Sequence, residues 1–177
     1  MTQYEAIIHS VMERSQFPIA SRATVRAALH DIPAKFLTNV RFRPFGEGEE
    51  QLAKKGLVLA EYQGYGNIAL SQKLFDFYIT PLRMRGYYWD VRGSPQRAGV
   101  VHELAHKIYD EHLMGLHKRW ESLYRRSGQE GRFVSSQARE HAEEGFAEAV
   151  VYYLYNPRRL KWVDEEMYRF IGDVLRV

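Results

Sequence analysis

The sequence predicts a single α+β domain over residues 1–177, in which a small sheet comes before a helical half. Extended, apolar runs occur in the N-terminal part of the chain, whereas after about residue 96 the apolar residues recur every three or four positions. A chain of 177 residues that is 45% hydrophobic can also bury one sizeable core. The expected parts are 1–56 (N-terminal helices and first strand), 57–95 (sheet and rim) and 96–177 (helical half).

The chain is expected to open with two helices. Residues 3–15 place three aliphatic side chains on one side of a helix. A shorter helix is expected at 21–30, with Ser21 as its N-cap, because a serine hydroxyl can accept a hydrogen bond from a backbone N–H of the first turn. These two helices form a layer that precedes the sheet.

Three extended segments predict the sheet. The first, 35–45, is rich in phenylalanine and aliphatic residues, contains a proline near its end and is followed by a turn at 46–50. The next two, 57–62 and 67–71, are separated by Gln-Gly-Tyr-Gly, which is typical of a hairpin. We therefore expect a small antiparallel or mixed sheet.

After an irregular stretch at 80–95, the rest of the chain is predicted to be helical. Asn156 and Pro157 mark a break, because asparagine is a good N-cap and proline is tolerated in the first turn of a helix. The expected helices lie at about 96–113, 117–127, 137–155 and 158–176.

Composition narrows the possible chemistry. The chain has no cysteine, which excludes disulfide bonds, thiol nucleophiles and cysteine-ligated metal, so any metal must be held by histidine and carboxylate. The first thirty residues contain no apolar run typical of a signal peptide or membrane span. A cytoplasmic location is therefore the default expectation and no membrane partner is predicted. Secretion by another route and a phage origin stay open.

The net charge of +3 is only a weak basic bias. One segment combines basic and aromatic residues, as some nucleic-acid surfaces do, but no stacking-module motif accompanies it. A solvated segment with packed aromatics is the favoured interpretation, and no nucleic-acid partner is predicted. The oligomeric state is open. The residues of this segment are Arg83, Arg85, Tyr87, Tyr88, Trp89, Arg92 and Arg97.

The segment His-Glu-Leu-Ala-His at 102–106 matches the H-E-x-x-H pattern of helical zinc sites. On an α-helix, His102 and His106 differ by about 40° around the axis and about 6 Å along it, so both imidazoles can reach one ion. Glu103 points about 100° away, where a carboxylate can contact a water on the metal instead of the metal itself. The apolar residues around the motif place one side of this helix against the core, with the histidines at the edge of the buried face.

A catalytic zinc usually has three protein ligands, so a third ligand must come from elsewhere. His112 stands where one group of proteases has a third histidine, but that arrangement needs a glycine at the position of Tyr109. On a continuous helix His112 faces about 240° away from His106. His117 returns to the same face but lies about 16 Å further along the axis. Both histidines are disfavoured.

A carboxylate on the helix expected at 137–155 is the favoured third ligand. Glu144 and Glu148 stand four residues apart in a segment that is otherwise mainly apolar. Buried carboxylates need a cation or strong hydrogen bonds, and a metal ion with its histidines would supply both. The alternative is that both glutamates face water at the edge of a groove.

Together, HELAH at 102–106 and EGFAEA at 144–149 resemble the gluzincin zinc metallopeptidases, most of all the anthrax lethal factor-like catalytic domains and the Pro-Pro endopeptidases. The similarity covers roughly residues 57–177. It implies a zincin-like fold, one zinc ion per chain, and Glu148 as a hydrogen-bond partner of a zinc histidine. The implied zinc ligands are His102, His106 and Glu144.

Such proteins commonly have a tyrosine ahead of the ligand glutamate that hydrogen-bonds the oxyanion, and Gln137 falls on that position here. An amide can donate a hydrogen bond, but it is not a proton source like a phenol. Three other donors stay open for this role: Tyr124, His141 and Tyr109.

The hypothesis from sequence is a zinc-dependent endopeptidase in which Glu103 is the general base for a metal-activated water. Its substrate is a protein or peptide, which by the resemblance adds as a strand beside an edge of the sheet, expected here at Asn67, Ile68, Ala69 and Leu70. Two alternatives stay open: a protease of DNA-associated proteins, and a toxin-like or structural zinc-binding module with weak or no proteolysis.

Overall fold

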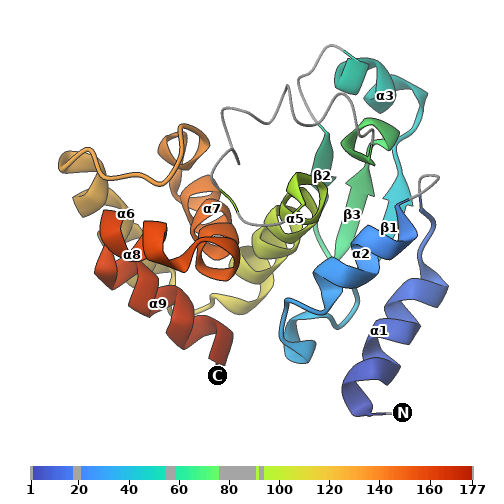
Figure 1. Cartoon of the computed structure of the whole chain (residues 1–177), viewed down its shortest axis with the longest axis horizontal. Helices are drawn as coiled ribbons and strands as arrows, with labels where there is room; N and C mark the ends of the chain where they lie inside the picture. The colour runs from blue at the N-terminus through green and yellow to red at the C-terminus, as the bar shows by residue number, and fades with distance from the viewer. Residues whose placement is uncertain (1, 18–20, 55–58, 76–90, 92–93, 177) are drawn as a thin grey trace.

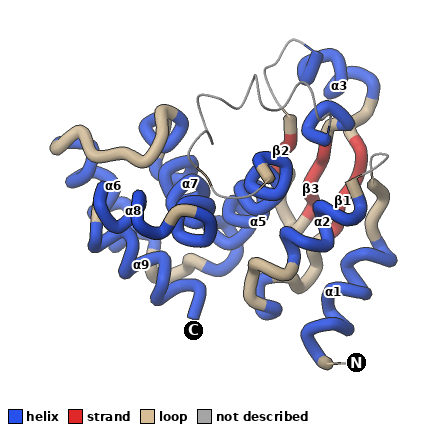
Figure 2. The backbone as a smooth tube through the Cα atoms, in the orientation of Figure 1, coloured by secondary structure: helices blue, strands red, loops and turns tan. Residues whose placement is uncertain are grey.

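The structure is a computed structural model that describes residues 2–17, 21–54, 59–75, 91 and 94–176. It has an α+β architecture in which helices predominate and the strands are short (Figure 1, Figure 2). Within these ranges no helix combines the length and the apolar character needed to cross a membrane. The α-helices are α1 (Gln3–Arg14), α2 (Arg22–Leu29), α3 (Glu47–Lys54), α5 (Pro95–His112), α6 (His117–Gln129), α7 (Ala142–Tyr155), α8 (Pro157–Val163) and α9 (Glu165–Arg176). The strands are β1 (Arg41–Pro44), β2 (Ala60–Tyr62) and β3 (Asn67–Leu70), and the 3-10 helices are η1 (Ala34–Phe36), η2 (Gln72–Phe75) and η4 (Gln137–Arg139).

The sheet is mixed. β3 lies in the middle, where it pairs in parallel with β1 and antiparallel with β2. The expected β2–β3 hairpin is confirmed, and its turn uses positive φ angles at Gly64, Tyr65 and Gly66. Parallel strands cannot be joined by a tight turn, and the chain between β1 and β3 passes through α3 and β2.

The prediction that Asn67–Leu70 is an edge of the sheet is wrong. β3 is hydrogen-bonded to a strand on both sides, so β1 and β2 are the outer strands in the part of the sheet that the structure describes. Ile68, Ala69 and Leu70 are all buried, as is usual for a central strand. A short apolar run does not reveal how many partners it has, because the parallel partner β1 comes from a distant part of the sequence.

Two boundaries in the N-terminal half differ from the prediction. Residues 35–45 do not form one strand, because η1 occupies their start and β1 begins only at Arg41. Residues 46–50 are not a turn but lead into α3. The Glu49 carboxylate accepts a hydrogen bond from the backbone N–H of Gly46 at 2.6 Å, which closes the first turn of that helix.

The helix expected at 137–155 begins later than predicted. Residues 137–139 form η4, and α7 starts at Ala142. His141 has extended backbone angles and is the N-cap of α7, since its Nδ1 accepts a hydrogen bond from the backbone N–H of Glu144. Histidine is not among the usual capping residues, so the sequence did not indicate this break.

The last expected helix is divided into α8 and α9. Asp164 ends α8 in an extended conformation, and its Oδ1 accepts hydrogen bonds from the backbone N–H groups of Glu166 and Met167 at 2.9 and 3.0 Å. The predicted cap at Asn156 is confirmed, because its side chain accepts from the N–H of Arg159 at 3.2 Å.

The helix α5 lies in the middle of the molecule, with the sheet and α2 on one side and α6 to α9 on the other (Figure 1). Every residue from Ala98 to Ile108 is buried. On the side of the helical half, an aromatic cluster of Trp120, Phe146 and Phe170 packs with ring separations of 5.4 and 5.5 Å. The part of α5 that carries the motif is therefore buried on all sides, more deeply than a one-sided apolar stripe predicted.

Most of the basic and aromatic segment lies outside the described residues, namely Arg83 to Trp89 and Arg92. Arg97 is described, and its guanidinium forms a bidentate ion pair with Asp31. The hydroxyl of Tyr155 donates to the same carboxylate. This contact joins α5 to the ends of α2 and α7, so Arg97 has a structural partner within the protein.

We predict that Gly66→Ala lowers the free energy of unfolding by at least about 2 kcal/mol. Gly66 has a φ of +75°, and a Cβ at this position would lie 2.4 Å from the backbone oxygen of Asn39. Chemical denaturation measures the change. Gly48→Ala is the matched control, since a Cβ there meets nothing within 4 Å, and it should leave stability unchanged or slightly higher. Equal stability of both variants would contradict the packing of this turn.

Candidate metal centre

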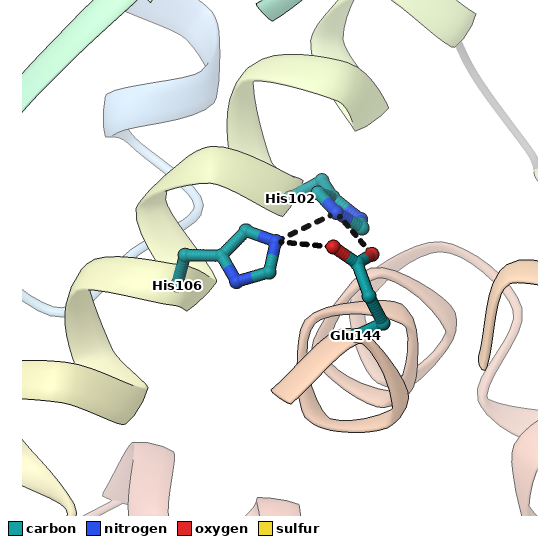
Figure 3. Close-up of side chains that lie close together, drawn as sticks. All are labelled: His102, His106 and Glu144. Carbon is teal, nitrogen blue, oxygen red and sulfur yellow. Dashed lines mark hydrogen bonds and ion pairs between the residues drawn. The ribbon is translucent and has the colours of Figure 1, made fainter. Parts of the chain in front are cut away.

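Three predicted ligands meet where α5 packs against α7 (Figure 3). His102 and His106 lie one turn apart on α5 and direct their Nε2 atoms at the carboxylate of Glu144, in the first turn of α7. The two Nε2 atoms are 3.0 Å apart. His102 Nε2 lies 3.1 Å from one oxygen of Glu144, and His106 Nε2 lies 3.3 Å from the other.

The Nδ1 atom of each histidine, on the far side of the ring from Glu144, contacts a further carboxylate. His102 Nδ1 is 2.9 Å from Glu148 Oε1, and His106 Nδ1 is 2.9 Å from Glu143 Oε1. Because a carboxylate only accepts, each Nδ1 carries the proton and donates it. In the neutral form of the two histidines, both Nε2 lone pairs then face the Glu144 oxygens. The centre is lined by hydrogen-bond acceptors, which repel one another unless protons or a cation lie between them.

The spacing of these atoms suits a small cation. Ligands about 2.0–2.1 Å from a common tetrahedral centre lie about 3.3 Å from one another. The three separations of 3.0, 3.1 and 3.3 Å are close to that value. The buried group of His102, His106 and Glu144 could therefore hold a metal ion. Three protein ligands would leave one tetrahedral position for a water or a substrate.

The two outer carboxylates differ in their surroundings. Glu148 is fully buried, and its other oxygen accepts a hydrogen bond from the hydroxyl of Ser135 at 2.5 Å. Glu143 is 41% exposed. Sequence reasoning anticipated the contact between Glu148 and a histidine but missed Glu143 and Ser135. The only signal for Glu143 was its place beside Glu144, where an acid is also common for favourable interaction with the helix N-terminus.

We call the group of His102, His106 and Glu144 the cage, and Glu103 lies outside it. The residue is 8% exposed, and its Oε2 accepts a hydrogen bond from the backbone N–H of Tyr62 on β2 at 2.7 Å. Burial raises the pKa of Glu103, against the opposing effect of His102 and His106. A buried carboxylate with a raised pKa, next to the cage but not in it, is suited to accept and return a proton.

Glu144 and each of the two histidines shift each other's pKa values. Burial alone would lower the pKa of His106, but hydrogen bonds to Glu143 and Glu144 outweigh it and raise this pKa to about 9. His102 behaves in the same way, with its pKa raised by Glu144 and Glu148. Burial opposes ionisation of Glu144, yet the two histidines lower its pKa. Two protons can thus take the place of a metal ion between these groups.

The two disfavoured histidines have other contacts. His112 Nε2 lies 3.2 Å from Lys107 Nζ, and the His112 ring packs edge-on against Phe36. His117 Nε2 lies 2.7 Å from the backbone oxygen of Tyr109. Neither belongs to the ligand group that the described residues form.

The open candidates for the oxyanion donor also differ in position. Gln137 Nε2 donates to Glu144 Oε2 at 2.8 Å, so this amide borders the cage. His141 caps α7 through its Nδ1. The hydroxyl of Tyr124 donates to the backbone oxygen of Arg139 at 3.0 Å, and the ring of Tyr109 packs against Phe146. Among the hydrogen bonds that the described residues form, Gln137 is the candidate whose side-chain N–H reaches one of the three ligands.

Comparison of the chain with protein-family models, with curated proteins and with solved structures gives no match.

We predict that the purified chain binds about one equivalent of added zinc and that Glu144→Ala weakens this binding at least about 100-fold, because one of three ligands is lost. Metal analysis after dialysis and competition with a chromophoric chelator measure both quantities. His112→Ala is the matched control and should keep the metal. The reverse pattern, with metal lost on changing His112, would contradict the assignment of Glu144 and favour a site of three histidines.

Metal binding should become tighter as the pH rises. At pH 7 the raised pKa values keep His102 and His106 protonated in the metal-free protein, so the metal must displace these protons. For each displaced proton, apparent affinity should rise about tenfold per pH unit until the pH passes the pKa of about 9 at His106. Chelator competition between pH 6 and pH 8 measures the slope. An affinity independent of pH would show that these histidines are already neutral.

Proposed function

We propose that this chain is a zinc-dependent endopeptidase. The observation that carries the proposal is the convergence of two imidazoles and one carboxylate on a common centre, with the separate carboxylate of Glu103 beside them at the edge of β2. A purely structural zinc site has four protein ligands and no open position. The described residues supply three, together with a buried acid that takes no part in the cage.

Zinc is the metal that this donor set favours. Two neutral imidazoles and one carboxylate form a common catalytic zinc site, whereas magnesium and calcium prefer oxygen ligands. The chain has no cysteine that would favour a thiolate-bound metal or cluster. When bound, zinc supplies a Lewis acid that polarises a carbonyl and lowers the pKa of water.

The chain's own residues then have distinct roles. Glu103 takes the proton of the attacking water on a carboxylate oxygen and delivers it to the nitrogen of the leaving amine. Glu143 and Glu148 keep the Nδ1 proton on the two histidines, which keeps both Nε2 lone pairs available. Gln137 donates one amide N–H to Glu144, and its second N–H is the proposed donor to the developing oxyanion. With this assignment, an amide of Gln137 takes the place of the tyrosine hydroxyl as the donor to the oxyanion.

Because β3 is the central strand and β2 an outer one, β2 is the strand that we propose for substrate binding. The outer side of β1 is already bonded to the segment after α1, since Phe42 N–H donates to Ser15 Oγ and Phe42 oxygen accepts from Gln16 N–H, both at 2.9 Å. β2 lies against α5, beside Glu103. On the outer side of β2 the Tyr62 N–H already donates to Glu103, so a peptide in extended form would bond the outward backbone groups of Ala60.

We predict that Glu103→Gln retains zinc and lowers kcat for peptide cleavage by about 10² to 10⁴-fold, because the amide cannot accept and return a proton. Cleavage of a peptide library by zinc-loaded protein, with and without a chelator, measures turnover and specificity together. Glu121→Gln, an exposed change on α6, is the matched control and should cleave normally.

Full activity of Glu103→Gln would contradict its role as the base. A stoichiometric zinc site with no cleavage of any peptide would contradict the peptidase and favour a zinc-binding module. Cleavage restricted to DNA-bound proteins would favour the protease of DNA-associated proteins instead.

A further inference from the structure

The outer side of β2 holds Glu103 by its backbone. Leu59 and Gln63 face β3, since Ser71 N–H donates to the Leu59 oxygen at 2.9 Å and Gln63 N–H donates to the Asn67 oxygen at 2.8 Å. In an antiparallel ladder the backbone groups of alternate residues point to opposite sides. The N–H of Tyr62 therefore points away from β3, where Glu103 Oε2 accepts it at 2.7 Å.

The side chain of the same residue is held further along α5. The hydroxyl of Tyr62 lies 2.9 Å from Asp110 Oδ2 and 3.0 Å from Glu111 Oε1. Burial, together with these two carboxylates, raises the pKa of Tyr62 and keeps its phenol protonated, so it remains a donor at neutral pH. Glu103 and Glu111 are two turns apart on one helix, and Tyr62 contacts both.

Glu111 is itself held by a buried cation. Lys107 is fully buried, and its Nζ lies 2.8 Å from Glu111 Oε2. A lysine is rarely buried without a charged partner, because loss of its hydration is costly. This pair fixes the carboxylate that receives the Tyr62 hydroxyl. A line of contacts thus runs from Lys107 through Glu111 and Tyr62 to Glu103.

We propose that Tyr62 is a positioning residue for Glu103, and that the contacts of its hydroxyl with Asp110 and Glu111, backed by Lys107, clamp β2 against α5. The clamp fixes the backbone N–H of Tyr62, which aims the Glu103 carboxylate, and it sets the distance between the strand that receives substrate and the helix that carries the base. The role of Glu103 as a base rests on the proposed function; the clamp itself does not.

Tyr62→Phe tests this inference, because it removes the hydroxyl and keeps the ring. Hydrogen exchange at the backbone amide of position 62 should become at least about tenfold faster, since a hydrogen bond from this phenol to a charged group is lost and the strand is released. Zinc content should not change, because the hydrogen bonds of Tyr62 among the described residues reach Glu103, Asp110 and Glu111 and not the three ligands. In zinc-loaded protein, kcat should fall about tenfold, because Glu103 loses the fixed N–H that aims its carboxylate, and any rise in KM from the loosened strand should be smaller.

Two further variants sharpen the result. Tyr65→Phe is the matched control, since Tyr65 is 91% exposed in the adjoining turn, and it should change neither exchange nor kcat. Glu111→Gln keeps an acceptor for the phenol but loses the charge paired with Lys107, so it should change both quantities in the same direction as Tyr62→Phe and by less.

Unchanged amide exchange in Tyr62→Phe would overturn the clamp. Faster exchange with unchanged kcat would overturn its role in positioning Glu103. An unsubstituted protein that binds zinc but cleaves no peptide would refute the proposed function, and the amide exchange would still decide whether the clamp exists.

Discussion

Four of the six residues from His102 to Lys107 are ionisable and buried, and the arrangement of the fold depends on finding partners for them. Taking a charged group out of water costs several kcal/mol unless hydrogen bonds or an opposite charge replace the solvent. Lys107 pairs with Glu111 of the same helix, whereas the other three have partners on both sides of α5. The two histidines contact carboxylates of α7, and Glu103 contacts the backbone of β2. The sheet and the helical half must both dock on α5 before it can be buried.

The hydrogen bonds that compensate the buried polar groups also set the tautomer and the orientation of the site residues. The bonds from Nδ1 to Glu143 and Glu148 compensate buried imidazoles, and they also select the tautomer whose Nε2 can bind a metal. The bond from Tyr62 compensates Glu103 and also orients it. The same side chains must be correctly placed for folding and for any metal ion, which would displace the protons that the two histidines hold in the metal-free protein.

Elements of the fold that depend on residues close together in the sequence were predicted better than those that depend on a single side chain. The start of α5, the hairpin at β2 and β3, and the cap at Asn156 depend on residues within a few positions of one another, and these were predicted well. The division at Asp164 and the start of α7 at His141 depend on single side-chain caps. Hydrophobic periodicity does not report such caps, so the expected helices ran through them.

The same distinction between local and distant interactions applies to the candidate site. The sequence by itself determined that His102 and His106 share one face of a helix and that Glu144 and Glu148 share another, because a helical period of 3.6 residues is a local property of the chain. Only the tertiary structure decided that Glu143 backs His106, that Tyr62 holds Glu103 and that β3 is central. Those features depend on which surfaces of distant segments pack together, and residue spacing along the chain carries no record of that choice.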